Sequence, residues 1–342
     1  MNKILLSIIF MFLMAGLTSC TKEVEDNLSN EPEDKIKIGL SFDSFVIERW
    51  QRDRDVFMYT AEELGAEVNV QNANGDVEKQ ISQIEYFIDK EMDVILIIAI
   101  DSKAFVPVVK KARDAGIKII AYDRLLINSN VDLYISFDNE KVGSLMGKAL
   151  KDNVPEGGNI TTIFGPTTDY NVQLVEQGYN SVMEGTDINV VYSVNAVNWV
   201  AEEAYYAVYE ALSITPDIHG VFCGNDNLAT EAVRALSENR LAGSVIVTGQ
   251  DADLAACQRI VEGTQTMTVY KPVDKLAKAA AEYAVKLAKG EDIDVSTTIN
   301  DGTWYVPYVK LEPIAVTKDN MDEIIIDGGF QKREEVYLNV SE

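Results

Sequence analysis

Along residues 36–289, short apolar runs alternate with segments in which apolar residues recur every three or four positions. A short apolar run is typical of a buried strand, and the longer period is typical of a helix that buries one face. The first part of the pattern predicts strands at 36–40, 67–71, 94–98, 117–122 and 133–137, and helices at 48–64, 77–90 and 104–115. Because the central strands are apolar on both faces, they indicate a parallel sheet covered by helices on both sides.

The pattern restarts near Asp138 and Asn139. The second part predicts strands at 160–164, 190–194, 220–223, 245–248 and 266–270, and helices at 141–151, 174–183, 202–212, 228–236 and 254–262. Two consecutive β/α runs of similar size predict an α/β protein with two doubly wound lobes. A further helix is predicted at 277–289. If it returns to the first lobe, the chain crosses between the lobes more than once.

The N-terminus has the pattern of an export signal. Lys3 precedes an almost unbroken apolar stretch at 4–17, which is shorter than the roughly 20 residues of a membrane-spanning helix. The stretch ends in Leu-Thr-Ser-Cys, which resembles the lipobox of bacterial lipoproteins. The resemblance implies a signal peptide at 1–19, lipid on Cys20 and a polar tether at 20–34; the alternative is an ordinary signal peptide. The other cysteines, Cys223 and Cys257, are expected to be buried free thiols.

Length and composition exclude several classes of protein. A chain of 342 residues favours two domains over one. With 55 acidic and 30 basic residues the net charge is -25, which argues against a nucleic-acid partner. The single histidine, His219, excludes most histidine-based metal sites and weakens any catalytic triad. We therefore expect no metal and no cofactor.

Polar and aromatic residues follow one predicted strand after another, where ligands bind in open α/β sheets. They are Asp43, Glu48, Arg49, Trp50, Asp123, Arg124, Asp169, Tyr170, Asn171, Asn198, Trp199, Asn225, Asp226, Gln250, Asp251 and Lys271. Each hydroxyl of a sugar both donates and accepts hydrogen bonds, so charged and amide groups can satisfy it in pairs. The apolar faces of a pyranose ring can pack on tryptophan. This set therefore suits a neutral, polyhydroxylated ligand.

Long blocks of the sequence also carry a family resemblance. The segments KIGLSFDSFVIERWQRDRDVF, QNANGD, AYDR, YISFDNEKVG, GND, GQDADLAACQRI and GTQTMTVYKP resemble the D-xylose-binding branch of the periplasmic sugar-binding proteins of ABC transporters. The resemblance implies two Rossmann-like lobes, joined by a three-segment hinge, that close on one monosaccharide. The expected N-terminal lobe is 35–138 plus 272–305, and the expected C-terminal lobe is 139–271 plus 306–342. A membrane permease is the implied partner, and the protein is expected to be a monomer on the outer side of a membrane.

Matching motifs carry the family's ligand-binding positions to this sequence. They imply contacts from Arg49, Trp50, Asp123, Arg124, Asn171, Trp199, Asn225, Asp251 and Lys271, with the two tryptophans as stacking surfaces. The sequence departs from the family around Asn171 and between 191 and 199. These departures could shift the preference to another pentose or to a hexose.

Simpler interpretations stay open for several residues. Asp43 and Asp226 could each cap a helix or contact a ligand, and Glu48 suits the positive end of a helix dipole. Asp123 and Arg124 could form an ion pair with each other or hold a sugar. Two other functions are also compatible with the sequence: a sensing subunit for a membrane histidine kinase or chemoreceptor, and a glycosidase with paired carboxylates.

Overall fold

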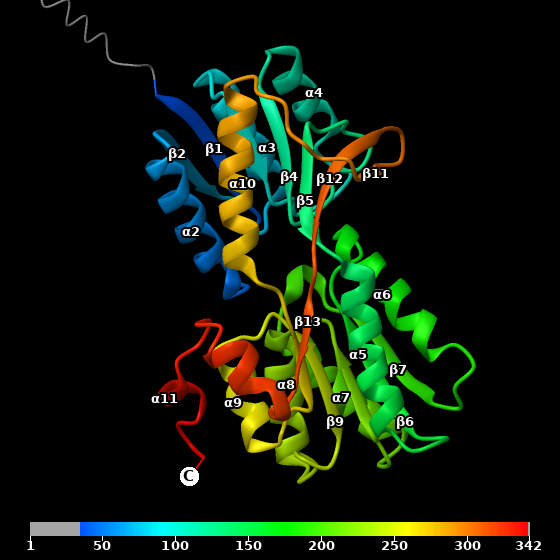
Figure 1. Cartoon of the computed structure of the whole chain (residues 1–342). Coiled ribbons are helices and arrows are strands. Elements are labelled where there is room, and N and C mark those ends of the chain that lie inside the picture. The colour runs from blue at the N-terminus through cyan, green and yellow to red at the C-terminus, as the bar shows by residue number, and fades with distance from the viewer. Residues whose placement is uncertain (1–34, 341–342) are drawn as a thin grey trace, which may run out of the picture. The chain divides into compact units, whose positions relative to one another are not determined.

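The computed structural model describes residues 35–340, and two sheets organise them into two α/β lobes (Figure 1). Each strand and helix predicted above is present, with small shifts at the ends. The prediction of two doubly wound lobes is therefore confirmed. None of the helices in the described part of the chain is long and apolar enough to cross a membrane.

The first lobe contains a sheet of order β11-β12-β5-β4-β3-β1-β2, in which all neighbours are parallel except β11 and β12. Its strands are β1 (Ile36–Phe42), β2 (Ala66–Asn72), β3 (Val94–Ile97), β4 (Lys118–Tyr122), β5 (Leu133–Phe137), β11 (Thr298–Asn300) and β12 (Tyr305–Leu311). Its helices are α2 (Arg49–Glu63), α3 (Val77–Asp89), α4 (Val106–Asp114) and α10 (Val273–Ala288).

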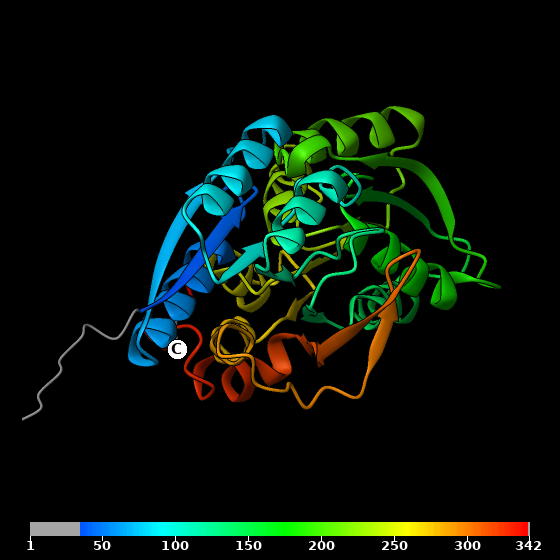
Figure 2. The ribbon, with the colours of Figure 1, turned by 90° about the horizontal axis from the view of Figure 1, so that it is seen from above.

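Alternation along the central strands explains why this sheet is covered on both faces. On β3, Val94 and Leu96 belong to the core beneath α2 and α10, whereas Ile95 and Ile97 belong to the core beneath α3 and α4. Neighbouring side chains of a strand point to opposite faces, so an unbroken apolar run needs helices on both sides. Figure 2 shows this arrangement with α10 seen nearly end-on.

The second lobe repeats the plan with a sheet of order β13-β10-β9-β8-β6-β7. Its strands are β6 (Asn159–Phe164), β7 (Asn189–Asn195), β8 (Gly220–Cys223), β9 (Ile246–Gln250), β10 (Met267–Tyr270) and the antiparallel β13 (Ile314–Val316). Its helices are α5 (Asn139–Asn153), α6 (Tyr170–Met183), α7 (Glu202–Ile214), α8 (Asp226–Glu238) and α9 (Leu254–Glu262). A short 3-10 helix (Val197–Trp199) follows β7. The segments Lys318–Asn320, Asp322–Ile326 and α11 (Arg333–Val336) follow β13.

Two glycines set the position of α6, whose N-terminal end reaches the interface between the lobes. A Cβ atom on Gly143 of α5 would lie 1.8 Å from the Val175 carbonyl oxygen, and one on Gly178 of α6 would lie 1.8 Å from the Glu140 carbonyl oxygen. Only glycine permits this approach of two backbones, because any side chain at either position would overlap the opposite helix.

The predicted position of the third crossing between the lobes is wrong by several residues. β12 pairs in parallel with β5, from Tyr308 opposite Tyr134 to Leu311 opposite Phe137, so the chain stays in the first lobe until Leu311. It then enters the second lobe through β13, as the long connection in Figure 1 shows. The expected boundary places 306–311 in the C-terminal lobe, and the sequence pattern predicts no strand there. Pro307 in that stretch argues against a strand, since proline cannot donate to the ladder.

Candidate functional site

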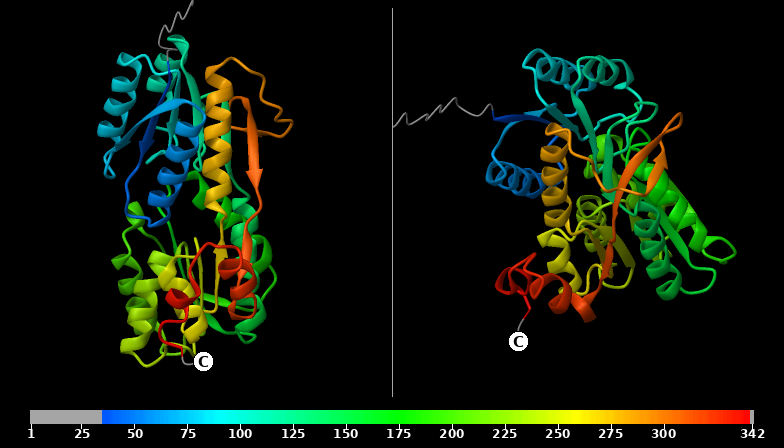
Figure 3. Two further views of the ribbon diagram at one scale, coloured as in Figure 1. Left: turned by 60° about the vertical axis from the view of Figure 1, so that its left-hand side comes forward. Right: turned by 45° about the horizontal axis from the view of Figure 1, so that its top comes forward.

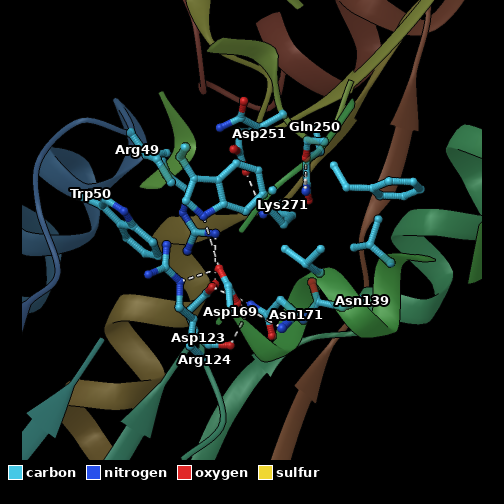
Figure 4. A pocket seen from close by; sticks show the side chains of 18 residues that line it. Arg49, Trp50, Asp123, Arg124, Asn139, Asp169, Asn171, Gln250, Asp251 and Lys271 are labelled. Atoms are coloured by element: carbon cyan, nitrogen blue, oxygen red, sulfur yellow. Dashed lines mark hydrogen bonds and ion pairs between the residues drawn. The ribbon is translucent and has the colours of Figure 1, made fainter. Parts of the chain in front are cut away.

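A buried cavity lies between the lobes, at the carboxyl ends of strands from both sheets (Figure 4). Its volume is about 30 Å³, because the side chains that line it lie close together. We call it the interlobe cavity; its lining consists of Ile47, Arg49, Trp50, Asp123, Arg124, Asn139, Phe164, Gly165, Asp169, Asn171, Val172, Val175, Trp199, Gly224, Asn225, Gln250, Asp251 and Lys271. All nine residues that the sequence resemblance implied are therefore brought together around one space.

Strand ends deliver these side chains because parallel strands all terminate at the same edge of a sheet. In the first lobe, α2 begins with Arg49 and Trp50 shortly after β1, and Asp123 with Arg124 directly follows β4. In the second lobe, the lining residues follow β6, β7, β8, β9 and β10 in turn. They are Asp169 and Asn171, then Trp199, then Asn225, then Gln250 and Asp251, and finally Lys271.

Arg49 is held from two sides in the first lobe. Its Nε and Nη2 donate to the Asp53 carboxylate at 3.1 and 3.0 Å, and its Nη1 lies 2.9 Å from Asp123 Oδ2. The Tyr122 hydroxyl also donates to Asp53. Each of these side chains is buried, so the guanidinium has little freedom to turn. The arrangement fixes a cation and a carboxylate side by side on the cavity wall.

The surroundings of Asp123 stabilise its ionised form. Burial alone would raise its pKa, but the positive charges of Arg49 and Lys271 more than offset burial and lower it below the ordinary value. The carboxylate is therefore ionised at neutral pH and available as a hydrogen-bond acceptor. Its backbone has a φ of 63°, a left-handed conformation that is uncommon for residues other than glycine.

Arg124 joins the two lobes. It lies 2.7 Å from Asp43 of its own lobe, donates to the Ala99 carbonyl oxygen at 2.9 Å, and lies 2.7 Å from Asp169 Oδ2 of the second lobe. Burial raises the pKa of Asp169, and the nearby Arg124 opposes the rise. Asp123 and Arg124 thus pair with other residues and not with each other.

Asn171 makes a second polar link between the lobes. Its Nδ2 donates to Asp123 Oδ1 at 3.0 Å and to the Asp123 carbonyl oxygen at 3.1 Å. The Asp169 side chain caps α6 by accepting from the Asn171 backbone amide at 3.0 Å. The N-terminal turn of α6 is therefore oriented toward the first lobe by its own cap.

The second-lobe wall differs because it carries two amide side chains that are only half paired. Asn225 uses its Oδ1 to cap α8 at Leu228, and Gln250 uses its Nε2 to donate to the Gly224 carbonyl oxygen. Within residues 35–340, the buried Asn225 Nδ2 and Gln250 Oε1 lack a hydrogen-bond partner, as does the indole Nε1 of Trp50 on the first-lobe wall. A buried donor or acceptor left unpaired costs about 1–3 kcal/mol, so the two amide atoms favour a polar occupant of the cavity. Beside them, Lys271 Nζ lies 2.7 Å from Asp251 Oδ1.

Two buried tryptophans supply the flat apolar surfaces. Trp50 lies under the guanidinium of Arg49, 4.4 Å from the ring centroid, and Arg124 lies 5.6 Å away. Trp199 donates from Nε1 to Asp169 Oδ2 at 3.3 Å. A Cβ atom on Gly165 would lie 2.3 Å from the Trp199 ring, so this glycine makes room for the indole.

Left-handed backbone conformations cluster at this site. Besides Asp123, they occur at Trp199 (φ 59°), Asp251 (φ 103°) and Ala252 (φ 57°). Such conformations cost of order 1–3 kcal/mol each and persist where the surroundings over-determine them. Here they turn the side chains after β4, β7 and β9 toward the cavity, which is a geometric reason for retaining them.

The structure also decides the alternatives left open for the flanking residues. Asp43 does not line the cavity; it supports Arg124 and accepts from the Ser44 backbone amide. Glu48 is exposed at the N-terminal end of α2. Asn225, not Asp226, caps α8. Asp226 is fully buried and accepts from Gln265 and Thr268.

The sequence prediction of the site missed several lining residues. Asp169 and Gln250 lie at predicted strand ends but are not among the implied ligand contacts. Asn139 enters the sequence analysis at the restart of the pattern and in a family block, not as a contact. Helical position gives a signal for the apolar pair, since Val172 and Val175 lie one turn apart on α6. Within residues 35–340 no cluster of histidine, cysteine or acidic residues could hold a metal ion. Cys223 and Cys257 are buried free thiols, as predicted.

Comparison with known proteins agrees with this architecture. A family model for the periplasmic binding protein domain matches residues 38–292, and the chain belongs to the periplasmic binding protein family. It is 45% identical over 307 residues to the D-xylose-binding periplasmic protein of Haemophilus influenzae, covering 88% of this chain and 92% of that protein. It is 43% identical over 325 residues to the D-xylose-binding periplasmic protein of Escherichia coli (strain K12), covering 94% and 98%.

A solved structure extends the agreement to three dimensions. An ABC transporter solute-binding protein from Clostridium phytofermentans with bound β-D-glucose matches with a TM-score of 0.80 and 27% identity, covering 88% of this chain and 99% of that one. The family resemblance predicted from the sequence blocks is thereby confirmed, and so is the two-lobed fold.

Proposed function

We propose that this protein captures a monosaccharide, D-xylose or a related aldose, in the interlobe cavity and delivers it to the permease of an ABC transporter. The observation that carries the proposal is the lining of that cavity, in which buried cations, carboxylates and amides surround a space that two tryptophans also line. The similarity of the chain to two D-xylose-binding periplasmic proteins supports the choice of sugar.

The geometry explains how such a ligand would be held. Each charged pair of the wall offers a donor next to an acceptor: Arg49 beside Asp123, Arg124 beside Asp169, and Lys271 beside Asp251. A sugar hydroxyl donates to the carboxylate and accepts from the cation, so each pair can serve one hydroxyl. The ring faces would pack on Trp50 and Trp199.

Binding would favour the closed arrangement of the lobes because both walls contribute to one ligand. Only a closed molecule brings Asp123 of the first lobe and Asp251 of the second lobe to the same sugar. A ligand that makes more contacts in one conformation shifts the population toward it by its difference in affinity. The closed form is then the signal that a permease reads.

Binding without catalysis is part of the proposal. A glycosidase needs one carboxyl group free to give a proton and a second to act as base or nucleophile. In this cavity, Asp123, Asp169 and Asp251 each lie within 3 Å of an arginine or lysine nitrogen. That arrangement suits holding hydroxyl groups and leaves no carboxyl pair free for acid–base chemistry.

Membrane attachment is proposed from the sequence alone. The lipobox-like segment ending at Cys20 lies outside the described residues. If Cys20 carries lipid, the protein is tethered to a membrane through residues 20–34, with the lobes facing the outside of the cytoplasmic membrane or the periplasm. Metabolic labelling with a fatty-acid analogue should mark the wild type and leave Cys20→Ser unmarked. Equal labelling of both would contradict the anchor.

Calorimetric titration of the purified protein against xylose, ribose, arabinose, glucose and galactose tests the main proposal. We expect saturable heat with at least one pentose at 1:1 stoichiometry and the tightest binding for xylose. An absence of heat with all five sugars would overturn monosaccharide binding. Release of product from aryl pentosides would overturn binding without catalysis.

A further inference from the structure

A second connection between the lobes lies outside the interlobe cavity, next to the crossing at Lys271 and Pro272. Its centre is Arg52 of α2, which is not among the cavity-lining residues. Arg52 contacts one residue of its own lobe, Asp274, and one residue of the C-terminal segment, Phe330. We call these three residues the Arg52 clasp.

The two halves of the clasp belong to different lobes. Arg52 Nε and Nη2 each lie 2.6 Å from the Asp274 carboxylate at the start of α10, and α10 packs beside α2 in the first lobe (Figure 3). Arg52 Nη1 donates to the Phe330 carbonyl oxygen at 2.8 Å, and the guanidinium lies 4.4 Å from the centre of the Phe330 ring. One side chain therefore uses three nitrogens to join the lobes.

Phe330 is fixed to the second lobe and to the loop beside the cavity. Its ring packs on Tyr270, the last residue of β10, at a centroid distance of 4.7 Å. The next residue, Gln331, donates from Nε2 to the Ala252 carbonyl oxygen at 3.3 Å. Ala252 directly follows Asp251, so the C-terminal segment supports the strained turn that presents Asp251 to the cavity.

The position of Arg52 on α2 links the clasp to the opposite wall. Arg49, Trp50 and Arg52 lie within one turn of the same helix, and the first two line the cavity while the third contacts Phe330. A rotation of the lobes that moves this turn away from the second lobe would also stretch the contact between Arg52 and Phe330. The contact within the first lobe, to Asp274, would survive such a rotation because both residues move together.

We infer that Arg52 is a positioning residue that stabilises the closed arrangement of the lobes and thereby sets how long the bound sugar stays. The inference rests on the proposed function, because it concerns retention of the same ligand. Arg52 acts through its contact with Phe330 and touches no ligand. Because this contact stabilises the closed conformation whether or not sugar is bound, losing it lowers the fraction of closed molecules at every sugar concentration.

The test compares Arg52→Gln with Arg54→Gln in purified protein, with xylose as the probe. Arg54 is a matched control on the same helix: it lies 2.6 Å from its neighbour Asp55 and stacks over Phe45, and within residues 35–340 it makes no hydrogen bond or ion pair with the second lobe. We expect Arg52→Gln to raise the Kd for xylose by about five- to tenfold, a moderate effect because the guanidinium is half-exposed. The association rate should stay within about twofold, so the loss should fall on dissociation measured by stopped-flow tryptophan fluorescence.

Two further measurements separate positioning from general damage. At saturating xylose, small-angle X-ray scattering should give Arg52→Gln and the wild type the same radius of gyration, whereas at subsaturating xylose the variant should be more extended. Arg52→Lys should be intermediate, because an ammonium group keeps the charge but lacks the planar fork that serves Asp274 and the Phe330 carbonyl together.

The outcomes distinguish this inference from the proposed function. If the wild type binds none of the sugars, the proposed function fails. If the wild type binds xylose and Arg52→Gln matches Arg54→Gln in Kd and in dissociation rate, the inference fails while the proposed function stands. A variant that lowers the melting temperature but leaves dissociation unchanged would show that Arg52 is structural only, and would also overturn the inference.

Discussion

The two walls of the interlobe cavity are built differently. On the first-lobe wall, Arg49, Asp123 and Arg124 are connected to buried partners behind them, chiefly Asp53 and Asp43. The charged groups of that wall are paired, and the indole Nε1 of its Trp50 has no partner among the described residues. On the second-lobe wall, two amide side chains, Asn225 and Gln250, each keep one buried polar atom without a partner there, and Lys271 pairs with Asp251.

This difference separates two physical tasks. A network in which each charge is already paired is rigid, and removing one member leaves an uncompensated buried charge, so its loss should appear in the stability of the folded protein. An amide side chain with an unpaired atom gains its missing hydrogen bond only when a ligand binds, so replacing that side chain should lower the affinity for the ligand. The predictions below test that division, in order of decreasing effect.

The largest expected effect is on affinity, from Asp251→Ala. The change removes the carboxylate beside Lys271 and leaves a buried ammonium unpaired in the cavity. Losing one member of a buried, hydrogen-bonded charge pair costs about 2–5 kcal/mol in binding, so calorimetry should show the Kd for xylose rising by at least about 30-fold. Affinity within a few-fold of wild type would mean that Asp251 does not contact the ligand.

Asp53→Asn should act mainly on stability. Asp53 is fully buried and holds Arg49 by two hydrogen bonds. The neutral amide cannot compensate the guanidinium, so the free energy of unfolding in urea should fall by about 3 kcal/mol. Asp55→Asn is the matched control on the same helix, because Asp55 is exposed and its ion pair, among the residues that the structure describes, is with Arg54. Equal stability of the two variants would contradict the idea that the charged network of the first-lobe wall stabilises the folded protein.

Trp50→Ala tests the stacking surface shared by both walls. The change removes a buried indole from the cavity, and we expect affinity for xylose to fall by about 10- to 30-fold from lost contact area. Trp304 is 42% exposed and lies outside the cavity, so Trp304→Ala should leave the Kd unchanged. A retained affinity in Trp50→Ala would place the stacking surface at Trp199 alone.

Gln250→Leu tests the unpaired acceptor of the second-lobe wall. The substitution removes Oε1 together with the hydrogen bond to the Gly224 carbonyl oxygen. We expect about a fivefold loss of affinity for xylose and a change in the free energy of unfolding of about 1 kcal/mol or less. A larger effect on unfolding than on binding would contradict the proposed task of this wall.

Apart from that order, a last prediction concerns pH and a carboxyl group behind the second-lobe wall. Burial raises the pKa of Asp226 to about 7, whereas the unfolded value is about 3.9. The folded state therefore binds the proton more tightly. Its contribution to stability is complete below about pH 4 and is lost as the pH rises through about 7.

Asp226→Asn cannot ionise and should lose this dependence. Melting temperatures measured from pH 5 to pH 8 should show the wild type falling relative to the variant as the pH rises. Asp123 of the first-lobe wall has a lowered pKa, so its own contribution has the opposite sign and is common to both proteins. The pKa of the neighbouring Asp253 is raised by burial and by the charge of Asp226, so it should fall in the variant. Parallel melting curves for the two proteins would show that Asp226 does not titrate in this range.

Sequence reasoning succeeded where the deciding interaction is local. Strand and helix positions followed from apolar periodicity, which reflects burial along a single element. The set of cavity residues followed from strand ends and from motif blocks, since every parallel strand presents its carboxyl end to the same edge of the sheet. The sequence alone places Arg49, Asp123 and Asp251 together in this way.

It failed where pairing partners lie far apart in the chain. β12 was missed because Pro307 weakens the strand pattern, and what makes it a strand is the open edge of β5 about 170 positions earlier. Asp123 and Arg124 are adjacent in sequence, yet one pairs with Arg49 and the other with Asp43 and Asp169.

The sequence by itself therefore determined that this chain forms two doubly wound lobes and gathers polar and aromatic side chains at their strand ends. Only the tertiary structure decided which polar atoms are already satisfied and which are not. It also decided where the chain crosses for the third time and that Arg52 contacts Phe330. The physical reason is that periodicity records the burial of each element, whereas the partner of a buried charge depends on which distant segments pack beside it.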